Sequence, residues 1–468
     1  MEVGCELEVD VNGEETFMVD KKILVCFSGK FRKLFAKLTS SGTSHLKVIF
    51  HNFPGGADGF ELVTRFCYNN GEIEITPSNI VMLNSAANFM EMGMNYSSVK
   101  PNLVDQTEKF LEGINYWTWS ELLLAIKQCQ DLFTSAENST FVVFEKVLDS
   151  TVGRLALPTV GSPFARSSEN FSSQFSSEIS STCSTTNCSS STTWWFQDLL
   201  FLNLNLFEKA TQMMVSQKLD HTTVFKFLIF YTKSRFCAAG VLLSEKRQIL
   251  EVVINLLSLL NRTCISCKGL FYILGMVSNV KKISKFHKLE LERLIGSKLD
   301  EATLDHILIR SPRRNEYTYD VDLVLRLVEC YFLEDMIMIP SRMKHVSRLI
   351  DSFLIEVASD TLLKPSKFAE LVMVIPDSAR ECCDVVYQAI ELYLEVHTRL
   401  CREEKMKLCS TLHCDKLSAG ALKHLSQSSM FHSRPAIQNR FYSFETVNAI
   451  SDETKCSKFR SLPKLCSC

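Results

Sequence analysis

The sequence has no surplus of charge of either sign, because its 51 Lys and Arg residues stand against 53 Asp and Glu residues among 468. A net charge of −2 gives no chain-wide reason to expect nucleic-acid binding. Glycine (17 residues) and proline (11 residues) are too scarce for a collagen-like protein, and 22% charged with 10% aromatic residues exclude wholesale disorder. The length instead predicts roughly two to four domains with apolar cores.

Long apolar runs are also absent from the sequence. The longest stretches, at 194–207 and 224–231, are interrupted by Asn, Gln, Asp or Lys, so we expect no membrane-spanning helix. The first residues are acidic and lead into no apolar segment, so we expect no secretory signal. The 18 cysteines are then expected to be reduced thiols in a cytoplasmic protein.

None of the short motifs that mark common catalytic or phosphate-binding sites is present. The glycine-rich segment 55–59 lacks the Lys and Ser/Thr of a P-loop, and neither G-x-S-x-G nor H-E-x-x-H occurs. A C-x-x-C spacing at 264–267 has no second pair, and Cys409, His413 and Cys414 offer three further potential ligands. Packed or surface thiols are the favoured interpretation of both clusters, so the sequence predicts a non-catalytic protein without a cofactor or metal.

The first hundred residues mix the two periodicities of secondary structure. Alternation of apolar and polar residues predicts strands, and Asn12-Gly13 between two such runs predicts a tight hairpin turn. Apolar residues spaced by three and four predict helices. Strands are expected at 6–11, 17–19, 46–50 and 73–75, and helices at 23–38, 60–68 and 80–92.

Beyond residue 101 the strand signals nearly vanish. Apolar residues at 346–357 recur at helical spacing, as they do at 249–260 and 386–394, and each such stripe needs a partner surface. This region should therefore be a stack of amphipathic helices. Within it, Gly296 is expected to act as a C-cap and Asp300 to cap the next helix, while Glu290 and Glu292 are expected on solvated faces.

Two segments depart from this pattern. Residues 167–193 contain 17 Ser or Thr among 27, too few apolar groups to offset the entropy of ordering, so we expect a solvated linker. It could hold phosphorylation sites or serve only as a spacer. The tail 454–468 has three cysteines, no acidic residue and four basic residues, which are Lys455, Lys458, Arg460 and Lys464. It is either a frayed end or a peripheral membrane contact.

The N-terminal block resembles a BTB/POZ domain. Residues 19–24 and 28–35 resemble its strand-to-helix signature, although Asp20 stands where that signature usually has histidine. Residues 53–68 and 73–92 resemble the plant phototropic-response (non-phototropic hypocotyl three-like) family of BTB proteins. The segments 194–199, 289–305 and 387–394 then follow in the order of that family.

The resemblance implies an α+β N-terminal BTB/POZ domain followed by a large all-α helical domain. The expected divisions are the BTB/POZ domain at 1–98, a post-BTB helical segment at 99–165, the Ser/Thr-rich linker at 166–193, the family-specific helical domain at 194–440 and the basic, cysteine-containing tail at 441–468.

The function that the resemblance implies is that of a substrate-specific adaptor of a cullin-three RING E3 ubiquitin ligase in plant signalling, phototropism included. The BTB domain would dimerise and bind cullin-three, and the helical domain would recruit a target protein. The alternative is a ubiquitin-independent, membrane-associated scaffold for phototropin-type kinases, peripheral at the plasma membrane.

The resemblance also implies where two of these contacts lie. The dimer contact is expected at Ile23, Leu24, Phe27 and Phe31, with burial inside the domain as the competing interpretation for the same four residues. The cullin contact is expected at the end of the 60–68 helix and the turn after it, at Phe66, Tyr68, Asn69 and Asn70.

Overall fold

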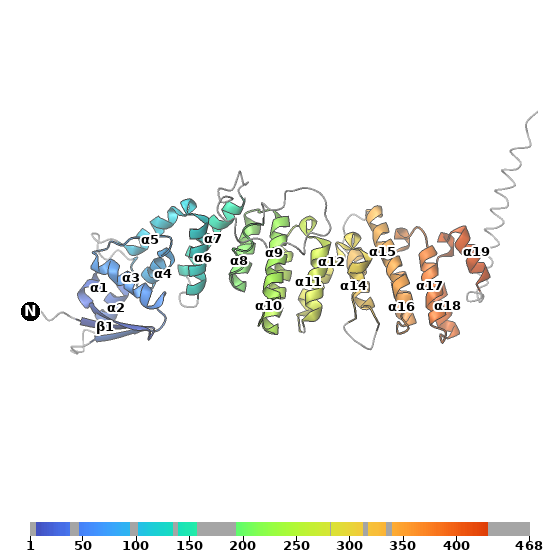
Figure 1. Ribbon diagram of the computed structural model, residues 1–468, viewed down its shortest axis with the longest axis horizontal. Coiled ribbons are helices and arrows are strands. Elements are labelled where there is room, and N and C mark those ends of the chain that lie inside the picture. The colour runs from blue at the N-terminus through green and yellow to red at the C-terminus, as the bar shows by residue number, and fades with distance from the viewer. Residues whose placement is uncertain are drawn as a thin grey trace, which may run out of the picture. The chain divides into compact units, whose positions relative to one another are not determined.

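The computed structural model divides the chain into two compact units, Met1–Cys264 and Ile265–Cys468. Figure 1 labels their helices and strands in chain order. The residues that the structure describes are 6–37, 46–93, 102–133, 139–156, 193–280, 282–311, 317–333 and 339–428. The basic tail and the Ser/Thr-rich linker, except Thr193, lie outside them. Among the described residues, no helix has both the length and the apolar character that a membrane crossing requires.

The first unit begins with a three-stranded sheet in the order β2-β1-β3. Strand β1 (Glu6–Val11) runs antiparallel to β2 (Glu15–Asp20) and parallel to β3 (Leu46–Phe50). The predicted hairpin turn is confirmed, because Asn12 and Gly13 both have positive φ, at 58° and 72°. Asn12 also joins the hairpin to the segment after β3, because its side-chain amide accepts from the N–H of Phe53 and donates to the Phe53 carbonyl.

The strand predicted at 73–75 is wrong. These residues pair with no strand, and Ile73 and Ile75 instead pack half-buried against the core. The alternation correctly indicates that Ile73 and Ile75 face the core. An extended segment can place alternate side chains on the core without forming the hydrogen bonds of a sheet.

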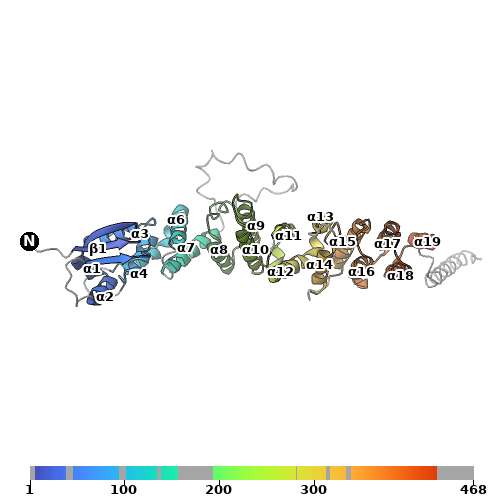
Figure 2. The same cartoon turned by 90° about the horizontal axis from the view of Figure 1, so that it is seen from below.

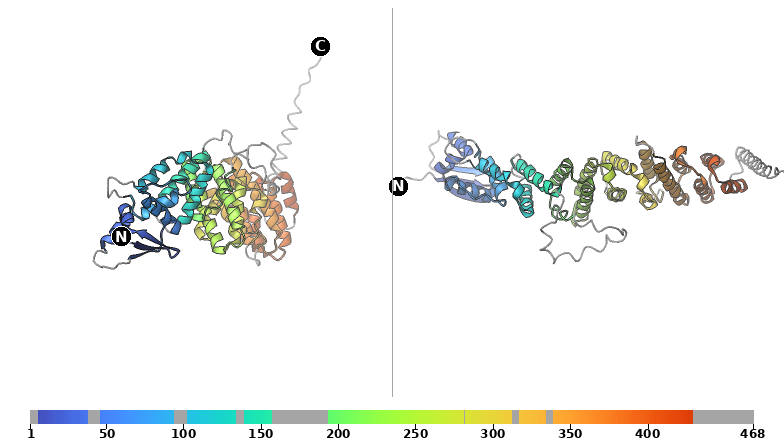
Figure 3. Two further views of the ribbon diagram at one scale, coloured as in Figure 1. Left: turned by 60° about the vertical axis from the view of Figure 1, so that its left-hand side comes forward. Right: turned by 90° about the horizontal axis from the view of Figure 1, so that it is seen from above.

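Helices α1 (Lys21–Phe27), α2 (Gly29–Lys37), α3 (Gly56–Tyr68) and α4 (Ile80–Phe89) complete the α+β domain beside the sheet (Figure 3). The single helix predicted at 23–38 is interrupted at Ser28. The buried Ser28 hydroxyl donates to the Met90 carbonyl (2.8 Å) and accepts from the Phe31 N–H (3.2 Å). The core is rich in phenylalanine: rings of Phe50, Phe53, Phe60 and Phe89 pack with centroids 5.1–6.4 Å apart.

Helices make up most of the described remainder of the first unit. They are α5 (Leu103–Glu112), η1 (Ile114–Tyr116), α6 (Trp119–Leu132), α7 (Ser139–Ala156), α8 (Leu204–Ser216), α9 (His221–Phe236), α10 (Leu243–Leu257) and η2 (Arg262–Cys264). Helix α6 packs against the segment that precedes α8, because Trp119 Nε1 donates to Asp198 Oδ2 (2.8 Å) and the Trp119 ring meets that of Trp194. Residues on the two sides of 157–192 therefore belong to one packed unit.

The second unit is a stack of helices in two layers (Figure 2). Helices α12, α14, α16 and α18 follow one another in one layer, and α15 and α17 lie side by side in the other. The predicted stripe at 346–357 is confirmed, because its apolar residues are almost completely buried. The elements are α11 (Cys267–Asn279), α12 (Lys285–Gly296), η3 (Leu299–Glu301), α13 (Leu304–Ile307), α14 (Val321–Leu333), α15 (Pro340–Ala358), α16 (Pro365–Met373), η4 (Asp377–Ala379), α17 (Asp384–Val396), α18 (Arg402–Ser410), η5 (Cys414–Lys416) and α19 (Ala419–Gln427).

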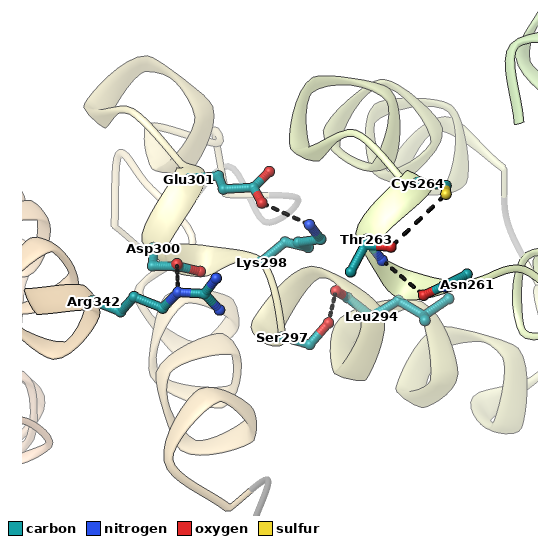
Figure 4. A network of polar contacts seen from close by, with 9 residues as sticks. All are labelled: Asn261, Thr263, Cys264, Leu294, Ser297, Lys298, Asp300, Glu301 and Arg342. Atoms are coloured by element: carbon teal, nitrogen blue, oxygen red, sulfur yellow. Dashed lines mark hydrogen bonds and ion pairs between the residues drawn. The ribbon is translucent and has the colours of Figure 1, made fainter. Parts of the chain in front are cut away.

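Both predicted caps in this unit are wrong. Gly296 is the last residue of α12, and the cap that follows, Ser297, has ordinary right-handed dihedrals. Asp300 lies within η3, and its carboxylate pairs with Arg342 of α15 at 3.4 Å (Figure 4). Helix α13 instead begins after Thr303, whose N–H donates to His306 Nδ1. Gly296 serves another purpose: a Cβ there would lie 2.5 Å from Cys330 Cβ, so its absence lets α14 approach closely.

We predict that Gly296→Val lowers the free energy of unfolding by about 1–3 kcal/mol, because the added side chain forces α12 and α14 apart. Urea unfolding followed by circular dichroism measures the effect. Gly275→Ala is the matched control, since a Cβ at that position of α11 meets nothing within 4 Å. It should raise the stability by about 0.5–1 kcal/mol. Equal stability of Gly296→Val and the wild type would contradict the packing argument.

Candidate interaction surfaces

The four residues expected at a dimer contact divide into two pairs. Leu24 and Phe31 have no exposed surface and belong to the core of the α+β domain, so they are not available to a partner. Ile23 and Phe27 are half-buried, and each keeps part of its side chain at the surface of α1. Only Ile23 and Phe27 of the four could therefore contribute apolar area to a contact.

The four residues expected to meet a cullin also divide. Phe66 is fully buried, and its ring packs edge-on against Phe27 with centroids 5.5 Å apart. Tyr68 is 51% exposed, and Asn69 and Asn70 are exposed in the turn that follows α3. Phe66 therefore packs in the core next to this turn, while the other three residues lie at the surface.

A contact that the sequence did not reveal fixes this turn to the start of α1. The Asp20 N–H donates to Tyr68 Oη (2.7 Å), and the Asp20 carboxylate accepts from the Lys22 N–H (2.7 Å). Asp20 thereby caps α1, a role that an aspartate before a helix could have suggested. The exposed ends of α3 and α1 are held together as one surface.

The second unit contains a cleft of ≈ 530 Å³. Its walls come from the end of α11, from α12, from α14, and from Ile309, Arg310, Ser311 and Asp320 beside the antiparallel Arg310–Tyr319 bridge. The apolar lining consists of Leu274, Val277, Val280, Leu291, Ile309 and Leu323. A recess of this size and character is typical of binding sites.

An ion pair between α12 and α14 shapes the cleft. Arg326 Nε and Nη2 donate to the two carboxylate oxygens of Glu292, each at 2.9 Å. Glu292 was expected on a solvated face, but it is only 8% exposed. These hydrogen bonds raise the pKa of the Arg326 guanidinium, which therefore stays charged. A buried carboxylate requires such a partner.

Cationic side chains outnumber carboxylates around the cleft. Three cationic side chains, Lys288, Arg310 and Arg326, and two carboxylates, Glu292 and Asp320, line it. Burial raises the pKa of the Asp320 carboxyl, although its Oδ1 accepts the Leu323 N–H at 3.0 Å. Lys288 and Arg310 are exposed at the rim.

The candidate cysteine and histidine clusters take structural positions. Cys264 ends η2 of the first unit, with its sulfur 3.8 Å from Thr263 Oγ1 (Figure 4), and Cys267 is buried at the start of α11 in the second unit. Burial raises the pKa of the Cys267 thiol to about 11. His413 Nε2 lies 3.1 Å from Asp377 Oδ1. Among the described residues, no group of three or more His, Cys, Asp or Glu side chains is arranged to hold a metal ion.

Comparison with known proteins gives two family matches. Residues 2–112 match the BTB/POZ domain, and residues 193–421 match the NPH3 family. The BTB/POZ domain-containing protein At3g22104 of Arabidopsis thaliana is 42% identical over 92% of this chain and 83% of its own length. A second Arabidopsis thaliana protein of that description, At1g50280, is 32% identical over 90% of this chain and 84% of its own length. No solved structure matches the chain.

We predict that Arg326→Met lowers the free energy of unfolding by about 1–3 kcal/mol, because it leaves the Glu292 carboxylate buried without a cation. The double variant Glu292→Met with Arg326→Met should recover most of that loss. Denaturant unfolding of the four proteins in this cycle measures the coupling.

Lys344→Met is the control for this cycle. It removes an exposed ion pair with Glu381 in the same unit and should change the stability by less than about 0.5 kcal/mol. An Arg326→Met effect no larger than that of Lys344→Met would show that the Glu292 pair does not hold α12 and α14 together.

Proposed function

The chain belongs to the NPH3 family and carries an N-terminal BTB/POZ domain, and from this premise we propose that it is a substrate-specific adaptor of a cullin-three RING ubiquitin ligase. In this proposal the chain performs no bond chemistry itself. The partner subunits transfer ubiquitin, and this chain brings the target to them in a plant signalling pathway, phototropism being the one that the family name suggests.

The observation that carries the proposal is the presence of two different kinds of surface in one chain. The α+β domain offers an exposed turn at Tyr68, Asn69 and Asn70 that a hydrogen bond joins to the start of α1, which suits docking to a partner. The helical unit offers a recessed cleft with charged walls, which suits selective recognition. An adaptor needs both kinds of surface and no catalytic group.

Self-association is part of the proposal. Ile23 and Phe27 on α1 would supply apolar area to a BTB dimer, next to the exposed Cys26. A dimer would present two helical units to one target or to two copies of it, which raises the effective concentration of each binding site.

We predict that the purified chain retains cullin-three in a pull-down assay, and that Asn69→Arg weakens this retention by roughly tenfold or more. The new charge would lie in the contact, while the Tyr68–Asp20 hydrogen bond remains. Tyr68→Ala tests the same surface and should give a similar loss, with circular dichroism to verify folding.

Met406→Ser is the control for the cullin assay, because it changes an exposed apolar side chain of α18 in the other unit. It should leave cullin-three retention unaltered. Phe66→Ala is unsuitable, since truncating a buried phenylalanine costs about 3–5 kcal/mol of stability. A well-folded wild-type chain that retains no cullin-three would refute the ligase proposal.

A second candidate function is a ubiquitin-independent scaffold for phototropin-type kinases, cytoplasmic and peripheral at the plasma membrane. The observation that favours it is the basic composition of 454–468. Each Lys or Arg close to an anionic leaflet contributes about 1 kcal/mol, so Lys455, Lys458, Arg460 and Lys464 together could hold the chain at a membrane.

We predict that deletion of 454–468 abolishes co-sedimentation with vesicles that contain phosphatidylserine. Replacement of the four basic residues by glutamine should have the same effect, and vesicles of neutral lipid alone should bind neither form. Binding of the wild type should also fall as salt is added, because the attraction is screened. If the deleted and full chains co-sediment equally, the tail plays no part in membrane contact.

A further inference from the structure

The cleft of the second unit has donors that the fold leaves unused. Arg326 directs Nε and Nη2 to Glu292, and within the part of the chain that the structure describes its Nη1 donates to no group. Lys288 and Arg310 at the rim have no ion-pair partner among the same residues. Three cationic groups thus converge on one recess with hydrogen-bond capacity to spare.

The carboxylates of the cleft already have partners within the fold, in contrast. Both oxygens of Glu292 are bonded to Arg326, and Asp320 Oδ1 accepts the N–H of Leu323 at the start of α14. The two carboxylates are therefore structural, since one pairs α12 with α14 and the other caps a helix. What remains for a ligand is an electropositive rim above an apolar floor.

These features distinguish among classes of ligand. The floor, formed by Leu274, Val277, Ile309 and Leu323 among others, would gain nothing from a bare phosphate ion but would bury an apolar side chain. A flat bilayer surface cannot enter a recess of ≈ 530 Å³. A basic segment would face unpaired cations of its own sign.

We propose that this cleft binds a peptide segment in which acidic side chains flank an apolar one, with the apolar side chain on the floor and carboxylates at Arg326 Nη1, Lys288 and Arg310. Arg326 is pre-oriented by Glu292, so a carboxylate meets a guanidinium already held in place. The proposal rests on the adaptor function in one respect: such a segment would belong to the recruited target.

Selection from a phage-displayed random peptide library on the immobilised full chain tests the proposal. The wild type should enrich peptides that combine Asp or Glu with Leu, Ile, Val or Phe. The variant Lys288→Glu with Arg310→Glu should lose this enrichment, because both exposed rim cations are reversed. Lys268→Glu is the matched control: it reverses an exposed lysine of α11 that does not line the cleft, and it should keep the wild-type preference.

The enriched peptide, labelled with fluorescein, is then titrated with each full-length protein. The rim variant should bind roughly tenfold more weakly than the wild type, and so should a peptide with Asn and Gln in place of Asp and Glu. Excess inorganic phosphate or phosphatidylserine vesicles should not displace the peptide. Enrichment of basic peptides, no consensus at all, equal binding by the rim variant, or displacement by phosphate or vesicles would each overturn the proposal.

This experiment uses no cullin, so the two proposals fail separately. Loss of cullin-three retention with intact peptide selection would refute the ligase adaptor and leave the cleft as a peptide site. Retention of cullin-three without an acidic consensus would refute the cleft proposal alone.

Discussion

The long helices described in the second unit bury apolar stripes against their neighbours, and this burial is the constraint on which the rest of the unit depends. A charged side chain that becomes buried in this packing needs an oppositely charged partner. Asp351 and Arg380 are 9% and 5% exposed and share bonds of 2.8 and 3.1 Å. Burial raises the pKa of Asp351, whereas the charge of Arg380 and its hydrogen bonds act to lower it. Glu292 and Arg326 solve the same problem next to the cleft.

Periodicity in the sequence predicts those features of the fold that local residues determine. The Asn12-Gly13 turn, the three strands and the long stripes of the helical region all follow from spacing within a few residues. The break at Ser28 does not, because the apolar spacing continues through it and its cause is a bond to the carbonyl of Met90, distant in the sequence. Asp300 illustrates the same limit, since its partner Arg342 lies on another helix.

The candidate surfaces were less predictable than the fold. Resemblance to a family identifies the α1 and α3 regions but cannot distinguish Phe66, which is buried, from Tyr68, which is half exposed. Both are aromatic and lie two residues apart, so only the packing decides which one is exposed at the surface. The cleft left no signal in the sequence at all, because its lining is drawn from separate segments between 274 and 326. The sequence predicts that Glu292 is solvent-exposed, because nothing local indicates that Arg326 of α14 pairs with it.

Stability and the proposed recognition share one side chain of the cleft and otherwise depend on different ones. Arg326 serves both, because the guanidinium that pairs with Glu292 also presents Nη1 to the recess, so a change there alters packing and site together. Lys288 and Arg310 are exposed and have no ion pair among the described residues, so their substitution should leave folding nearly unaffected. A set of adaptors that share one fold could therefore vary rim residues to select different targets, while the pair beneath keeps the shape of the recess. Binding selectivity can then change without the loss of stability that most core substitutions bring.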